Sequence, residues 1–101
     1  MAAMQPAASM KRTPALAVAF ARIDALEADY AAAVQRVLTG GTAISLELLV
    51  KPVDVARART MQIGTAWTTG RASEAEVIEA IGALARLMEM VIGTSGRFRR
   101  H

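Results

Sequence analysis

A chain of 101 residues is long enough for one domain. Its composition, rich in alanine and poor in aromatic residues, favours closely packed helices. It contains no cysteine, which excludes disulfides, thiolate nucleophiles and cysteine-ligated zinc or iron–sulfur centres. The net charge is +3. Both ends of the chain are basic and the last helical segment is acidic, a distribution that is compatible with both self-association and phosphate binding.

The N-terminal residues 1–12 show no periodicity and predict a disordered arm. Lys11 and Arg12, followed by the apolar run 15–20, imitate a secretory signal that would be cleaved after Ala21. Because the apolar residues continue in helical register beyond this point, we favour a cytoplasmic protein and keep secretion as the alternative. Arginine in large excess over lysine indicates a GC-rich, bacterial gene. No apolar stretch approaches the ~18 residues of a membrane span, so no membrane association is expected.

A first long helix is predicted over residues 14–38. Thr13 suits the N-cap, Pro14 the first helical position, and Gly40 with Gly41 the end. Apolar residues recur at spacings of three and four, which commits one stripe of the helix to a core. These residues are Leu16, Phe20, Ile23, Leu26, Tyr30, Val34 and Val37.

Residues 42–50 are ambiguous between a strand and a short helix. Four apolar residues alternate with smaller or polar ones, as in a half-buried strand: Ile44, Leu46, Leu48 and Val50. We favour the helix, because a lone strand would have no partner in this chain. Pro52 is predicted to end either element, and a second long helix is expected to run from Pro52 or Asp54 to about Thr68.

The last helix carries two apolar stripes. Ser73, three residues before Glu76, forms a capping box at its start, and Gly93 is predicted to end it. The main stripe consists of Val77, Ile81, Leu84, Met88 and Val91. A second stripe consists of Ala80, Ala83, Leu87 and Met90. Because a small bundle covers only one side of such a helix, we interpret the second stripe as an association face, with a central helix in a monomer as the alternative.

Together these elements predict an all-α fold, a small helical bundle of three long helices plus the short ambiguous segment at 42–50. Residues 13–93 would form a single helical domain, and residues 94–101 a basic, flexible tail. In that tail Arg97, Arg99 and Arg100 are candidate phosphate contacts.

The residues needed for catalysis or for holding a cofactor do not occur together. The single histidine is His101, and neither a cysteine nor a nearby acid accompanies it as a ligand or triad partner. Glu76 is explained by capping, and the neighbouring acids by the helix dipole. We therefore predict no catalytic residue, no metal and no cofactor, and a protein that is not an enzyme.

One segment order suggests DNA binding as the alternative function. Residues 44–50, then a helix that begins with proline, then a capped helix that begins at Ser73, resemble the ribbon-helix-helix repressors and antitoxins. That resemblance implies a dimer whose paired strands lie in the major groove. Glu47 stands on the face that would read bases, where a basic or amide side chain is expected, so no base contact is assigned. The favoured prediction stays protein–protein association, as a homo-oligomer or an adaptor.

Overall fold

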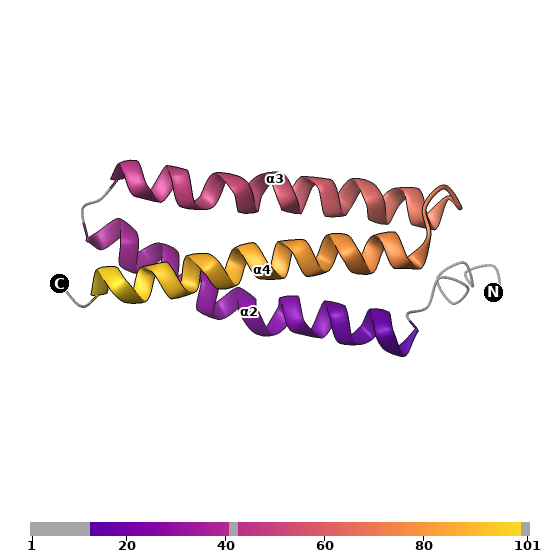
Figure 1. Cartoon of the computed structure of the whole chain (residues 1–101), viewed down its shortest axis with the longest axis horizontal. Helices are drawn as coiled ribbons and strands as arrows, with labels where there is room; N and C mark the ends of the chain where they lie inside the picture. Colours follow the sequence, from indigo (N-terminus) through magenta and orange to yellow (C-terminus); the bar gives the residue numbers. More distant parts are fainter. Residues whose placement is uncertain (1–12, 41–42, 100–101) are drawn as a thin grey trace, which may run out of the picture.

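The computed structural model describes residues 13–40 and 43–99, and in this part of the chain the side chains of 13–40 and 47–95. Three helices form a bundle in which each helix runs antiparallel to the one before it (Figure 1). They are α2 (Pro14–Thr39), α3 (Ala43–Thr68) and α4 (Glu74–Arg99). No strand occurs within these ranges, so the predicted all-α bundle is confirmed. The predicted N-terminal arm lies outside the described residues.

Helix α2 begins and ends where its capping residues predict. The side chain of Thr13 accepts a hydrogen bond from the Leu16 N–H at 3.2 Å, and Pro14 occupies the first helical position. At the other end the Gly40 N–H donates to the carbonyl of Arg36 at 3.1 Å. The last helical residue is Thr39, one residue beyond the predicted end.

Helix α3 corrects the predicted break at Pro52. Residues 43–68 form one continuous helix with Pro52 inside it, so the separate short segment does not exist. Proline removes the hydrogen bond to the carbonyl of Leu48. Both Leu48 and Pro52 are exposed, so water can hydrogen-bond that carbonyl, and the next residue, Val53, is fully buried and anchors the helix. The same finding removes the strand on which the resemblance to ribbon-helix-helix proteins depends.

The turn between α3 and α4 is set by one glycine. Gly70 adopts a φ of +79°, a conformation that glycine reaches without steric cost. The Arg71 N–H bonds to the Ala66 carbonyl at 2.7 Å and the Gly70 N–H to the Trp67 carbonyl at 3.1 Å, the pattern of a Schellman motif. This turn reverses the chain and brings α4 back along α3.

Helix α4 begins with the predicted capping box. The Ser73 N–H donates to Glu76 at 2.7 Å, and the Glu76 N–H donates to Ser73 Oγ at 3.2 Å. The predicted end at Gly93 is wrong, because the helix continues to Arg99. Ser95 gives the reason: its side chain is fully buried and accepts a hydrogen bond from Arg36 of α2 at 2.9 Å, so contact with α2 carries the helix past the glycine.

Most of the core comes from α2 and α4, as predicted. Every residue of the main α4 stripe is buried: Val77, Ile81, Leu84, Met88 and Val91. From α2 the buried side chains are Leu16, Tyr30, Ala33 and Val37. Among the described side chains of α3, Val53 alone is buried to this degree. Helix α4 contacts both other helices extensively, whereas α2 and α3 contact each other much less, so α4 is the central helix.

Candidate association surface

A groove of about 720 Å³ lies between α3 and α4. Its lining is mainly apolar, with charged side chains among the apolar ones. From α3 it includes Leu48, Lys51, Pro52, Val55, Ala56, Arg59 and Ile63. From α4 it includes Glu76, Glu79, Ala80, Ala83, Arg86 and Leu87. We call this surface the α3–α4 groove.

The groove exists because small side chains face each other where the two helices meet. Thr60 of α3 donates to the carbonyl of its own helix at Ala56, at 2.8 Å, and lies 3.5 Å from the carbonyl oxygen of Ala80 on α4. Alanine side chains at these facing positions are too short to fill the space between the helices. Larger apolar side chains beside them remain in solvent: Leu48 is 70% exposed and Val55 is 60% exposed.

The structure brings three of the four predicted association residues into this groove. Ala80, Ala83 and Leu87 line it, with Ala80 only 8% exposed. Met90 is 65% exposed but is not part of the lining. The predicted stripe is therefore one side of a groove and not a flat face.

Sequence reasoning missed the α3 half of the groove. Leu48, Pro52, Val55 and Arg59 recur at spacings of four, three and four, which is the signature of one helix face. Reading Pro52 as a helix end placed Leu48 and Val55 on different elements and concealed this spacing. A continuous helix through the proline would have revealed it.

Glu76 of the groove accepts the hydrogen bond of the capping box, whereas the other charged side chains of the groove have no ion-pair partner within the described part of the chain. The two ion pairs found there join Arg22 to Glu89 at 2.9 Å and Arg57 to Glu27 at 2.9 Å. Neither pair uses a groove residue. Lys51, Arg59, Glu79 and Arg86 are thus available to a binding partner.

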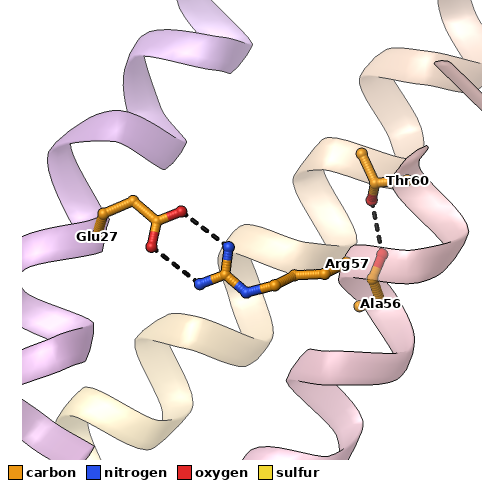
Figure 2. Close-up of polar contacts among 4 residues, drawn as sticks. All are labelled: Glu27, Ala56, Arg57 and Thr60. Atoms are coloured by element: carbon orange, nitrogen blue, oxygen red, sulfur yellow. Dashed lines mark hydrogen bonds and ion pairs between the residues drawn. The ribbon is translucent and has the colours of Figure 1, made fainter.

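On the other side of the bundle, polar contacts join α2 to its neighbours. Figure 2 shows Arg57 reaching from α3 to the Glu27 carboxylate of α2, where each of two guanidinium nitrogens donates at 2.9 Å. The same guanidinium lies 5.6 Å from the centroid of the Tyr30 ring, a cation–π distance. The hydrogen bonds from Arg57 lower the pKa of Glu27, and burial raises the pKa of Tyr30. This cluster fixes α3 against α2 and leaves the groove face of α3 free.

Among the described residues, no group of three or more histidine, cysteine or acidic side chains could hold a metal ion. The candidate phosphate contacts Arg97 and Arg99 lie in the last turn of α4, where the backbone alone is described. Arg100 and His101 lie outside the described residues.

Within the described helices, none is long and apolar enough to cross a membrane. The fold and the groove define a small three-helix bundle with an open groove between α3 and α4. No protein-family model, curated protein or solved structure matches the chain.

Proposed function

We propose that the chain is a non-enzymatic protein that acts by associating with other proteins, as a homo-oligomer or an adaptor, and that the α3–α4 groove is its association site. The observation that carries the proposal is the groove itself, in which exposed Leu48 and Val55 stand beside unfilled space. Exposed apolar surface in a concave site with a charged rim is typical of protein-binding faces. An amphipathic helix laid into such a groove would bury this surface.

The test places a photo-crosslinking amino acid at Leu48 and, as a matched control, at Met61. Both side chains belong to α3 and are about equally exposed, 70% and 73%, but only Leu48 lines the groove. Each full-length chain is irradiated alone and in an extract of cells that naturally produce it. We expect specific adducts from position 48 and few from position 61.

A second substitution ties the adducts to the groove. Val55→Glu introduces a charge into the apolar lining at an exposed position, so it disturbs the groove while leaving the fold intact. Met61→Glu is the matched control, and circular dichroism verifies helix content. Adducts that are lost with Val55→Glu and kept with Met61→Glu support the proposal. Equal adducts from both crosslinker positions, or adducts insensitive to Val55→Glu, would overturn it.

A further inference from the structure

We propose that the occupant of the α3–α4 groove is a second copy of this chain, packed face to face about a two-fold axis that lies between the two copies, at right angles to α4, and passes beside Ala83. The proposal rests on the association function above and names its partner. In the resulting dimer the two α4 helices run antiparallel, and four helices surround the former groove. The chain's own charge pattern and the small residues at the crossing point argue for it.

The charges of one α4 helix complement those of a second α4 helix only when the two helices run antiparallel. Glu79 and Arg86 line the same groove, seven residues or two helical turns apart, a distance of about 10 Å along the helix. An axis midway between them places Glu79 of one copy beside Arg86 of the partner subunit, and the same contact is repeated by symmetry. A parallel arrangement would instead bring like charges together. Neither side chain has an ion-pair partner among the described residues of its own chain.

The position of Lys51 on α3 favours the same antiparallel arrangement. Thr60 approaches Ala80, which sets the antiparallel register of α3 on α4. In this register Lys51 of α3 lies farther along the groove than Arg86 of α4, toward the same end. The groove therefore has a basic end with Lys51 and Arg86 and an acidic end with Glu76 and Glu79, and Arg59 lies between the two ends. The two-fold axis places the basic end of one copy on the acidic end of the other.

Small residues stand where the two α4 helices would cross. Gly82 and Ala83 lie at the midpoint between Glu79 and Arg86, and small side chains permit the short interaxial distances of about 8 Å seen in closely packed helices. The Arg86 guanidinium lies over Gly82, where a β-carbon would be 3.6 Å from Nη1. In the dimer the exposed Arg86 side chain turns away from Gly82 toward Glu79 of the partner subunit, which keeps the two Arg86 guanidinium groups apart at the axis. Leu48 and Val55 of α3 would be covered by α3 of the partner copy.

The test is a charge-swap series on the full chain, followed by sedimentation equilibrium. Glu79→Arg or Arg86→Glu alone sets like charges against each other at both symmetric contacts, so each should raise the dimer Kd about tenfold or more. The double variant Glu79→Arg/Arg86→Glu should restore the wild-type Kd. An equimolar mixture of the two single variants should dimerise, because every contact between the unlike chains is then complementary. Arg71→Glu, an exposed reversal outside the groove, is the control and should change nothing.

The outcomes separate this inference from the proposed function. A wild-type chain that stays monomeric at about 1 mM would overturn the two-fold packing, and so would a dimer Kd that does not change in the charge-swap variants. Failure of the mixture to dimerise would also overturn it. If the Leu48 crosslinker meanwhile reacts with a different protein, and Val55→Glu abolishes that adduct, the association function stands and only the identity of the occupant is wrong.

Discussion

The two faces of α4 are built from the same kind of apolar stripe, yet one is closed and the other open. Against α2, large side chains interdigitate, and polar contacts support the interface along its length: Thr13 with Glu74, Arg22 with Glu89, and Arg36 with Ser95. On the groove side, facing alanines leave space between α4 and α3. An apolar stripe thus indicates burial, but the size of its residues decides whether the chain can supply that burial alone.

The largest expected effect tests the closed side. Met88 is fully buried in a core cluster with Tyr30 and Ala33 of α2, whereas Met61 of α3 is 73% exposed. Met88→Ala should lower the free energy of unfolding by about 2–5 kcal/mol, because it removes buried surface and leaves a cavity. Met61→Ala should change it by less than about 0.5 kcal/mol. Urea denaturation measures both, and similar costs for the two would contradict the assignment of the core.

A smaller effect tests the polar contact that extends α4 past Gly93. Ser95→Ala removes the acceptor of the Arg36 hydrogen bond, and it should lower the free energy of unfolding by about 1 kcal/mol. Amide hydrogen exchange over residues 93–99 should accelerate, because that contact holds these turns on α2. A double-mutant cycle with Arg36→Met should give a coupling energy of similar size. Unchanged exchange would mean that the helix needs no support from Ser95.

The smallest effect concerns the contact between α2 and α3. Arg57 lowers the pKa of Glu27, so the stabilisation from this pair is present above the unfolded-state pKa, near 4.5, and is lost as the pH falls below it. Both side chains are more than a third exposed, which limits the contribution at neutral pH to about 1 kcal/mol or less. The difference in urea midpoint between the wild type and Glu27→Gln should therefore shrink between pH 7 and pH 3. A difference independent of pH would contradict this assignment.

Local signals in the sequence predicted much of this architecture. The cap at Thr13, the box at Ser73 and the spacing of the α4 stripe each depend on neighbours in the chain, so they can be read without a structure. The helix ends predicted at Pro52 and Gly93 were wrong because the outcome there depends on tertiary contacts. Both disfavour helix locally, but burial of Val53 next to one and of Ser95 beyond the other keeps the helix intact. The residues that α4 contributes to the groove could be predicted from the sequence, whereas those of α3 could be predicted only by knowing that Pro52 lies inside a helix.

The central position of α4 has a consequence for how the chain is made. Helices α2 and α3 touch each other little and meet mainly through α4, which is the last of the three to leave the ribosome. During synthesis the two earlier helices have most of their apolar faces uncovered until α4 arrives. A cooperative fold can therefore form only after the third helix has been translated, and a nascent chain paused in the α3–α4 turn would expose apolar surface that favours aggregation.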